Sequence, residues 1–435
     1  MIVRGPVVGL VLLGLVPVLL WPGRAGPVAL AWLLGTALLV VLDTLLATSP
    51  AALRLERGPV PQVRLQEVTS STLTLTNPGS RRLRGVLRDA WVPSAGADGA
   101  RHTLDVPGGE RRAVTTVLRP TRRGDRPAVG VTVRSHGPLG LGGRQRTVTV
   151  PGSVRSLPPF RSRRHLPSRL ARLRQLDGRS AVRTRGQGTE FDSLRDYVEG
   201  DDVRSIDWRA TARRQHVVVR TWQPERDRRV ILVLDTARLS AGRVGDEPRL
   251  DAAMDAALLL AALASRAGDR VDLLAGDRTV RARVGSRGGA ARSGLLHEMV
   301  SALSTLEPVL LETDWPMLAG AVNGLTRRRA LVVLLTPLEP AAVEESLLPV
   351  LPTLTAHHRV VVASVADPEL DRMRTDTSGI EQVYDAAAAE RTGTLRHRTS
   401  LALGQLGVSV LDETPERLPV ALADHYLALK AQGLL

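Results

Sequence analysis

Two apolar stretches at the N-terminus constrain this chain more than any other feature of its sequence. The first runs from Pro6 to Trp21, and the second runs from Pro27 to about Ala47 with Asp43 as its one acid. A short turn over 22–26 separates them. A membrane-spanning helix needs about 20 apolar residues. The second stretch is therefore long enough to span, and the first becomes so when it is counted from the start of the chain.

We expect both stretches to form a transmembrane helical hairpin over residues 1–50. A cleavable signal peptide is the alternative for the first stretch, because it has a basic start and an apolar run. Pro17 and the lack of a small-x-small site behind the run argue against cleavage. The turn carries only Arg24, whereas the outer flanks carry Arg4, Arg54, Arg57 and Arg64. The positive-inside rule then predicts a two-pass protein of the inner or plasma membrane with its soluble domains in the cytoplasm.

Residues 51–152 have the pattern of a small β-sandwich. Short alternating runs are separated by Gly, Pro and other turn residues. The runs are 71–76, 83–92, 111–118, 128–133 and 145–150. Several short strands at this spacing are typical of a sandwich. No group of residues in this module points to chemistry.

Residues 153–228 comprise a basic connector and then a dense polar motif. The connector holds ten arginines and one acid, Asp177, between Arg155 and Arg185. Leucines recur in it at helical spacing, at Leu166, Leu170, Leu173 and Leu176. This spacing predicts a basic amphipathic helix whose leucines pack on the next domain. Contact of its arginines with membrane lipid is the second possibility, and nucleic acid is a distant third because only Phe160 could stack on bases.

The polar motif alternates acids with arginines over residues 186–213, which read GQGTEFDSLRDYVEGDDVRSIDWRATAR. A guanidinium group can bind a carboxylate with two hydrogen bonds. The interleaving therefore predicts partly buried ion pairs held in place by apolar anchors. These anchors are Phe191, Leu194, Tyr197, Val198, Val203, Ile206 and Trp208.

The motif resembles the signature of the family called domain of unknown function 58, roughly G-x-G-x-E-F-x-x-L-R-x-Y-x-x-G-D-x-x-R-x-I-D-W-x-x-x-A-R. The matching residues are Gly186, Gly188, Glu190, Phe191, Leu194, Arg195, Tyr197, Gly200, Asp201, Arg204, Ile206, Asp207, Trp208, Ala212 and Arg213. The layout of membrane helices, β-rich module, motif and von Willebrand factor A-like domain is also similar. The resemblance implies a partner or adaptor of MoxR-type AAA+ ATPases in an assembly or chaperone system. For most residues of the motif we expect an ion-pair network that docks it onto the following domain. A recognition surface for a partner is the functional interpretation, and the two can coexist.

Residues 229–435 alternate strand and helix patterns, which predicts a doubly wound parallel sheet of the von Willebrand factor A-like kind. The expected strands are 230–234, 271–274, 330–335, 360–365 and 408–411. The expected helices are 249–267, 293–306, 315–326, 341–356, 380–390 and 416–431. Ligands of such sheets bind beyond the carboxyl ends of the strands. Asp235, Thr336, Asp367 and Asp412 fall at those ends.

Domains that this half resembles often hold Mg²⁺ through D-x-S-x-S, a distant threonine and a later aspartate. The first aspartate is Asp235, but Ala237 and Leu239 replace the two serines, and Ser240 is one place out of register. Thr313 could supply the threonine, and a proline stands where the later aspartate is expected. Mg²⁺ requires several oxygen ligands. We therefore predict a degenerate site, with Asp235, Ser240 and Thr313 as its remnants, and no cofactor.

The sequence gives little sign of an enzyme. It has no cysteine, so it has no thiol nucleophile and no cysteine-ligated metal. It also has no P-loop, no G-x-S-x-G elbow and no H-E-x-x-H helix. The enzymatic alternative is a metal-dependent hydrolase that uses Glu190, Asp201 and Asp207, although the neighbouring arginines already balance these charges. The sequence favours a membrane-anchored adaptor for protein–protein interaction.

Overall fold

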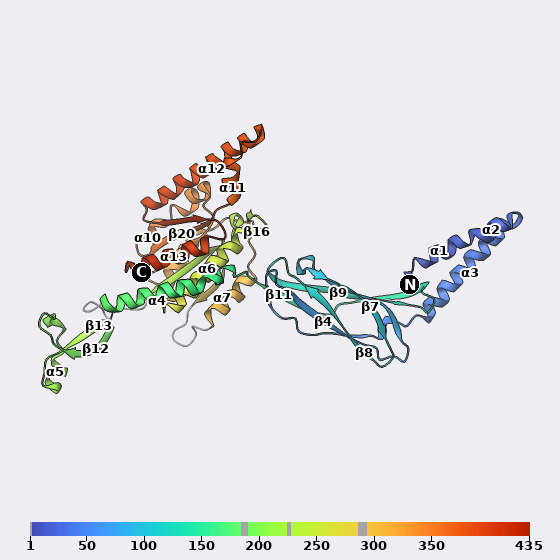
Figure 1. The fold of residues 1–435 in the computed structure, drawn as a ribbon, viewed down its shortest axis with the longest axis horizontal. Coiled ribbons are helices and arrows are strands. Elements are labelled where there is room, and N and C mark those ends of the chain that lie inside the picture. Colours follow the sequence, from blue (N-terminus) through green and yellow to red (C-terminus); the bar gives the residue numbers. More distant parts are fainter. Residues whose placement is uncertain (1, 184–189, 224–227, 286–293) are drawn as a thin grey trace. The chain divides into compact units, whose positions relative to one another are not determined.

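The computed structural model describes residues 2–183, 190–223, 228–285 and 294–435, with side chains described outside 177–193 and 221–223. The chain divides into two compact units, residues 1–157 and residues 158–435 (Figure 1). The membrane-type helices belong to the same unit as the β-rich residues, and the basic connector belongs to the unit that contains the α/β sheet.

The first unit begins with an apolar arm over residues 6–46. Helices α1 (Pro6–Leu13) and α2 (Leu15–Leu20) lead through a 3₁₀ turn, η1 (Pro22–Arg24), into α3 (Ala25–Leu46). The first two helices pack along α3. At this contact the indole of Trp32 donates a hydrogen bond to the carbonyl oxygen of Leu10 at 2.9 Å, and a Cβ on Gly14 would clash with the same ring.

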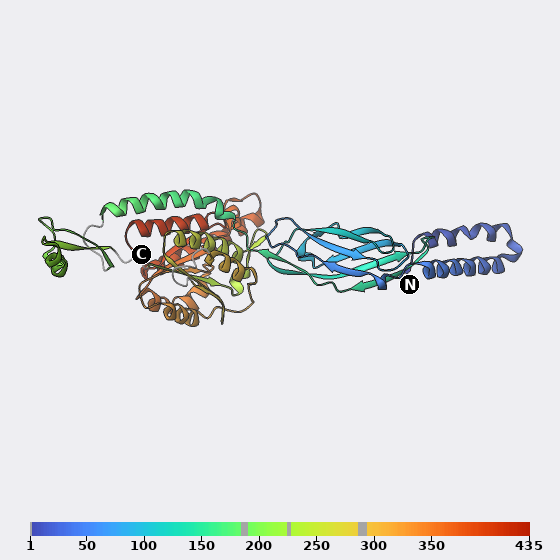
Figure 2. The ribbon, with the colours of Figure 1, turned by 90° about the horizontal axis from the view of Figure 1, so that it is seen from below.

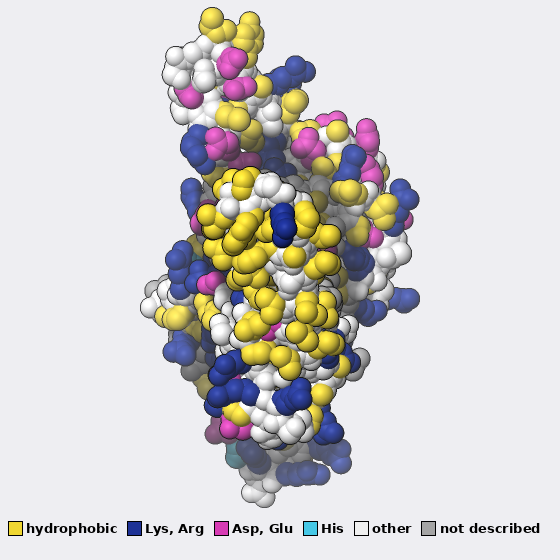
Figure 3. Space-filling model, turned by 90° about the vertical axis from the view of Figure 1, so that its right-hand side faces the viewer, with side chains coloured by type: hydrophobic (Ala, Val, Ile, Leu, Met, Phe, Trp, Pro, Cys, Tyr) yellow, Lys and Arg dark blue, Asp and Glu magenta, His cyan; other side chains and the backbone are white. Residues whose placement is uncertain are grey.

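The arm leaves its apolar side chains uncovered, and Figure 3 shows hydrophobic side chains over the end of the molecule that carries it. Thirteen leucines and valines on the arm are at least half exposed: Val8, Leu12, Leu13, Leu15, Val16, Leu19, Leu20, Leu30, Leu33, Leu34, Leu38, Leu45 and Leu46. Among the described residues, Pro22–Ala52 is the one helical stretch long and apolar enough to cross a membrane, and Pro6–Leu20 is shorter.

Both ends of the arm are fixed to the β-rich residues that follow. Strand β1 (Ile2–Val3), just before the arm, pairs antiparallel with β10 (Gly142–Val148). Near the other end, the buried Asp43 carboxylate accepts hydrogen bonds from the amides of Leu139 and Leu141, at 2.8 and 2.7 Å, and of Gly142, at 2.8 Å. These donors satisfy a charge that would be costly to bury alone. The chain therefore enters and leaves the arm at one place.

Residues 54–157 form the β-module, in which two sheets pack face to face (Figure 2). The first sheet contains β1, β10, β3 (Val63–Arg64), β5 (Leu83–Trp91), β7 (Arg101–Val106), β9 (Gly124–His136) and β11 (Ser153–Leu157). The second has the order β2 (Arg54–Arg57), β4 (Thr69–Thr76), β8 (Arg111–Leu118) and β6 (Ala97–Asp98). Alternate residues of both sheets build the core: Leu73, Leu75, Leu83, Leu87, Leu104, Val131 and Val133. All five expected strands are present, whereas β2, β7 and β11 were not predicted.

A buried ion pair joins the two sheets. Arg57 on β2 binds both oxygens of Asp89 on β5, at 2.9 and 2.6 Å, and the side chains are 1% and 0% exposed. Trp91 and Thr116 also donate to Asp89, and the Arg57 guanidinium lies 4.7 Å above the Trp91 ring and donates to Ser71. Burial acts to raise the pKa of Asp89, but these hydrogen bonds, led by that of Arg57, hold the pKa below its ordinary value.

We predict that Arg57→Met destabilises the β-module by about 3–5 kcal/mol, because it leaves an unpaired carboxylate in the core. Hydrogen–deuterium exchange of the slow amides in β4 and β5 measures this loss. The lowered pKa of Asp89 also means that its contribution is present above the ordinary carboxyl pKa and disappears as the pH falls through the lowered value.

The double variant Arg57→Met/Asp89→Leu is the control, since it removes both charges and should recover most of the protection. If the single variant exchanges like the wild type at neutral pH, the pair does not stabilise the module.

The second unit is built on a six-stranded sheet. Its order is β18 (Val280–Gly285), β17 (Arg270–Gly276), β14 (Arg229–Asp235), β19 (Leu331–Leu335), β20 (Arg359–Val365) and β21 (Ser409–Glu413). Strands β17 to β21 in this order are parallel, and β18 is an antiparallel edge strand. The five expected strands are all present. The edge strand was not predicted, although Val280, Ala282 and Val284 alternate along it with two arginines and a glycine.

Helices cover both faces of this sheet. One face carries α6 (Arg249–Arg266) and α13 (Leu418–Ala431), with α7 (Leu295–Ser304) beside α6. The other carries α8 (Trp315–Leu325), α10 (Leu351–Thr355) and the C-terminal end of α12 (Ile380–Gln405).

Three helices differ from the sequence prediction. The helix expected over 341–356 is interrupted: α9 (Pro340–Ala342) runs into a π-helical turn, η7 (Val343–Leu347), before α10. Pro352 lies in the first turn of α10, where the missing N–H costs nothing. Helix α12 continues 15 residues beyond the expected end at Glu390, and α11 (Pro368–Thr375) was not predicted.

The connector packs on two helices of its own unit, α6 and α13. Its 3₁₀ segment η4 (Arg161–His165) places the Ser162 hydroxyl 2.7 Å from the buried Asp255 on α6. Helix α4 (Leu166–Arg183) then packs on α6 and α13, with Leu173 only 3% exposed. Arg169 and Arg172 both reach Asp424 on α13, at 3.1 and 3.4 Å. The prediction that these leucines pack on the next domain is confirmed for Leu173.

Candidate docking platform

The polar motif folds into a hairpin of its own. Strand β12 (Glu190–Asp196) pairs antiparallel with β13 (Val218–Gln223). The connection between them carries a 3₁₀ turn, η5 (Val203–Ser205), and a short helix, α5 (Trp208–Arg214). Gly200 has φ +105°, which favours glycine in the turn after β12. The second strand lies beyond the family signature, so the signature alone did not predict this pairing.

Asp207 fixes the helix to the hairpin. One carboxylate oxygen accepts hydrogen bonds from the amides of Arg209 and Ala210, at 3.1 and 3.0 Å, and so caps the N-terminus of α5. The other oxygen accepts from Arg220 on β13 at 2.8 Å. The hydrogen bond from the Ala210 amide, together with Arg220, holds the pKa of Asp207 below its usual value.

Asp201 fixes the turn in the same manner. Arg195 on β12 donates to one carboxylate oxygen at 2.5 Å, and the amide of Val198 donates to the other at 2.9 Å. Arg195 is the main reason why the pKa of Asp201 is lowered. A third contact joins His216 to Asp196 at 2.9 Å. Each of these three side-chain pairs joins one part of the motif hairpin to another.

The apolar residues of the motif do not all act as buried anchors. Val198 is 62% exposed, Val203 is 60% exposed and Trp208 is 66% exposed. The expectation that they hold the ion pairs in place is therefore wrong for these three. A two-stranded hairpin with one seven-residue helix is too small to cover them, whereas the β13 residues Val218 and Val219 are buried.

The other predicted motif residues are placed only in part. Gly186 and Gly188 lie outside the described residues. Glu190 and Phe191 have backbone positions opposite Gln223 and Trp222 in the hairpin, and their side chains lie outside the described set. Three further motif residues lie in the connection between β12 and β13. The amide of Tyr197 donates to the carbonyl of Val217, and the amide of Arg204 donates to the side chain of Asp202. Arg213 is in the last turn of α5.

The hydrolase alternative gains no support from this geometry. Both oxygens of Asp201 and of Asp207 already accept hydrogen bonds from arginines and backbone amides. Within the residues that the structure describes, no three His, Asp or Glu side chains gather in a way that could hold a metal ion. A metal-dependent hydrolase that uses these acids stays a hypothesis.

A second polar site lies at the carboxyl end of β14. Asp235 is 2% exposed, and its oxygens accept hydrogen bonds from the hydroxyls of Thr313 and Thr336, both at 2.8 Å, and from the amide of Ala237 at 2.9 Å. Burial raises the pKa of Asp235. These residues line an open pocket, at which Arg238 and Glu312 form an exposed ion pair.

The donors in this pocket do not fit an octahedral magnesium site. Thr313 lies beside Asp235, as expected for two remnants of one site. Ser240 instead lies in the next 3₁₀ turn, where its amide donates to the carbonyl of Ala237. Ala237 and Leu239 bring no side-chain oxygen. The pocket offers one carboxylate, whose two oxygens already accept hydrogen bonds, and two hydroxyls. This is fewer oxygen ligands than octahedral coordination of Mg²⁺ requires. The degenerate metal site stays a prediction.

Comparison with known proteins gives a family match that begins within the motif. A family model described as protein of unknown function DUF58 matches residues 193–401. Uncharacterised proteins from Mycobacterium bovis and from two strains of Mycobacterium tuberculosis are 32% identical over 187 residues, which is 42% of this chain. The matched region covers 56% of each relative, so the chain spans about half the length of the curated relatives. The family resemblance is confirmed for this part of the chain.

Solved structures give only distant similarities. A CARDB domain from Pyrococcus furiosus covers 22% of this chain and 93% of its own, at 13% identity. The match to a β-glucosidase from Listeria innocua covers 23% of this chain and 16% of the glucosidase, at 16% identity. The match to the E. coli chaperone DraB covers 24% of this chain and 55% of DraB, at 13% identity. The TM-score is 0.16 in each case, which is too low to support an argument from fold.

We predict that Asp207→Ala frees α5 from the hairpin, because it removes both the helix cap and the partner of Arg220. The amides of α5, Thr211 among them, should then exchange with deuterium faster than in the wild type. Asp207→Asn keeps a capping oxygen and should retain most of the protection. Equal exchange in the wild type and the alanine variant would show that the cap does not hold the helix.

Proposed function

We propose that this protein is a membrane-anchored adaptor that docks a partner protein on its motif hairpin. In this proposal the apolar arm crosses the inner or plasma membrane twice, and the β-module and the second unit are cytoplasmic. The protein is not an enzyme and uses no cofactor in this proposal.

The surface of the apolar arm supports the anchor. A helix that is apolar all round is stable only inside a protein core or in a membrane, and most leucines of this arm are exposed. Its two ends are tied to the same part of the β-module, through β1 and through Asp43. A chain that enters and leaves at one place is suited to a two-pass hairpin. The tip carries only Arg24, whereas the base is rich in arginine, and this asymmetry favours a cytoplasmic base.

The observation that carries the docking role is an exposed tryptophan on a fixed frame. Trp208 is 66% exposed at the start of α5, whose position is set by Asp207 and Arg220. Tryptophan is enriched among residues that dominate binding energy. A frame that is rigid before binding lowers the entropic cost of association. The arginines and acids of the motif thus serve to shape a surface.

The family resemblance supplies the proposed partner, a MoxR-type AAA+ ATPase, and the setting, an assembly or chaperone system. A von Willebrand factor A-like second unit belongs to the same proposal. The parallel sheet with helices on both faces supports it, as does the position of Asp235, Thr313 and Thr336 at the carboxyl end of the central strands. Such a unit can bind a partner without a metal ion.

We predict that Trp208→Ala weakens binding of the MoxR-type ATPase from the same organism by at least about thirtyfold, since loss of a dominant interface side chain costs about 2 kcal/mol or more. The measurement is binding of the ATPase to the detergent-solubilised full chain by biolayer interferometry. The thermal stability should not change, because the side chain is exposed.

Tyr384→Ala is the matched control, because Tyr384 is an aromatic residue on α12 that is 74% exposed. It should bind as the wild type does. Equal affinity of the Trp208 and Tyr384 variants, or no binding of the ATPase by the wild type, would contradict the proposed docking role.

A further inference from the structure

We propose that a basic collar at the base of the apolar arm binds the phosphate headgroups of anionic phospholipids. The basic collar consists of Arg4, Arg81, Arg82, Arg144 and Arg146. This inference rests on the proposed membrane anchor and extends it by naming the class of lipid. It concerns arginines of the β-module and of the N-terminus, and it is independent of the connector helix.

Two members of the collar are attached to the end of α3 and the residues after it. The Arg144 side chain on β10 donates to the carbonyl oxygens of Thr44 and Leu45, at 3.1 and 3.4 Å. Arg146, two residues along the same strand, donates to the carbonyl of Ala51. The last carbonyls of a helix favour a nearby cation. The guanidinium groups therefore lie where a membrane-spanning α3 would leave the hydrocarbon.

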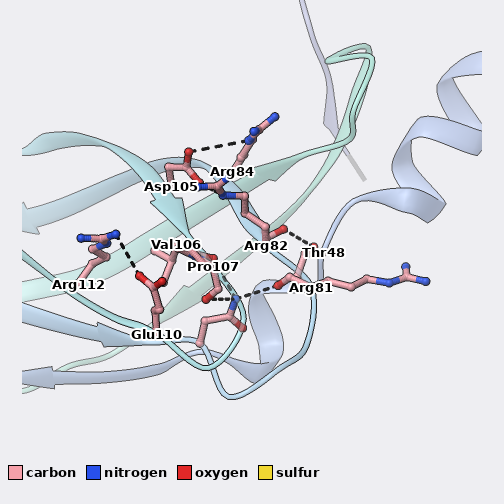
Figure 4. A network of polar contacts seen from close by, with 10 residues as sticks. Thr48, Arg81, Arg82, Arg84, Asp105, Val106, Pro107, Glu110 and Arg112 are labelled. Atoms are coloured by element: carbon pink, nitrogen blue, oxygen red, sulfur yellow. Dashed lines mark hydrogen bonds and ion pairs between the residues drawn. The ribbon is translucent and has the colours of Figure 1, made fainter.

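Two further members are held beside the same helix end by their backbones. Asn77 donates from its side chain to the carbonyl of Arg81 at 2.9 Å, and Thr48, just after α3, donates to the carbonyl of Arg82 at 2.9 Å (Figure 4). Figure 4 shows the side chain of Arg81 pointing away from the strands. The turn that carries both arginines is thus fixed, while the Arg81 guanidinium is free to reach a headgroup.

Arg4 completes the collar at the other end of the arm. It lies between β1 and α1, and its amide donates to the carbonyl of Leu141 at 3.0 Å. Leu141 belongs to the loop whose amides bind Asp43. The start and the end of the arm therefore share one basic rim.

The acids near this rim leave it positively charged. Asp43 is buried and bound by three backbone amides. Asp105 lies 2.6 Å from Arg82 and 3.9 Å from Arg84, so a single carboxylate is shared by two guanidinium groups. The other members of the collar keep their charge for an external anion.

Anionic lipid is the partner that fits both the charge and the place. The collar adjoins an uncovered apolar arm, so a ligand with an acyl chain and a phosphate would meet both surfaces at once. Each basic residue near an anionic membrane surface contributes about 1 kcal/mol. The four collar arginines outside the Arg82–Asp105 ion pair should therefore produce a measurable preference for anionic over zwitterionic lipid.

The test uses the full chain reconstituted in phosphatidylcholine vesicles with about 30 mol% phosphatidylglycerol, and electron paramagnetic resonance of spin-labelled lipids. We expect labelled phosphatidylglycerol to be enriched at the protein about threefold over labelled phosphatidylcholine, and the enrichment to fall as salt is added. The variant Arg4→Gln/Arg81→Gln/Arg146→Gln should show an enrichment of about one.

The matched control is Arg101→Gln/Arg119→Gln/Arg122→Gln, which removes the same charge from exposed arginines of the β-module outside the collar. It should keep the threefold enrichment. Loss of enrichment in this control as well, or no preference in the wild type, would overturn the proposal. If the triple collar variant does not fold, Arg81→Gln alone should still lower the enrichment, because this side chain points away from the protein.

An alkaline wash of the vesicles separates this proposal from the anchor on which it rests. A protein that the wash removes is not a membrane-spanning protein, and both proposals then fail. A protein that stays in the vesicles but shows no preference for phosphatidylglycerol contradicts the basic collar alone.

Discussion

The contact of Asp43 with two backbone amides of the β9–β10 connection and with the first amide of β10 sets the architecture of the first unit. It places the one acid of an apolar helix in a pocket where its charge is fully bonded, so the helix can be joined to a folded module without an unpaired charge. Strand β1 adds a second attachment before the arm begins. Together they turn a long apolar segment into an arm with both ends at one base.

The same principle organises the motif hairpin, where acids serve as acceptors for arginines and backbone amides. Asp201 and Asp207 have lowered pKa values because hydrogen bonds favour their charged forms. Asp235, whose pKa is raised by burial, is the opposite case. Acids of the first kind hold turns and helix ends in place. The motif hairpin therefore combines side-chain contacts between its parts with an exposed tryptophan, Trp208.

Much of the fold could be predicted from residue patterns. Alternation identified β8 with its observed bounds of Arg111–Leu118, and apolar runs identified the parallel strands of the second unit. Helix α6 was expected over 249–267 and spans Arg249–Arg266. These elements carry their signal locally, because one face or the whole element is buried.

Other features depend on contacts between distant residues and could not be predicted. Arg57 was counted among the charges that orient the arm, yet in the fold it is buried against Asp89, 32 positions away. The exposure of Trp208 was also missed, since an aromatic residue among ion pairs has the same sequence pattern whether it is packed or open. The collar was missed because its arginines come from three separate segments that only the tertiary fold assembles.

The central claim is that the arm crosses the membrane and returns, with both ends on the cytoplasmic side. The chain has no cysteine, so single-cysteine variants can be labelled without background. Gly23→Cys at the tip should react with a membrane-impermeant maleimide in right-side-out vesicles, whereas Ser80→Cys near the base should react only after the vesicles are opened. Labelling of Ser80→Cys in closed vesicles, or a need to open them before Gly23→Cys reacts, would contradict the account.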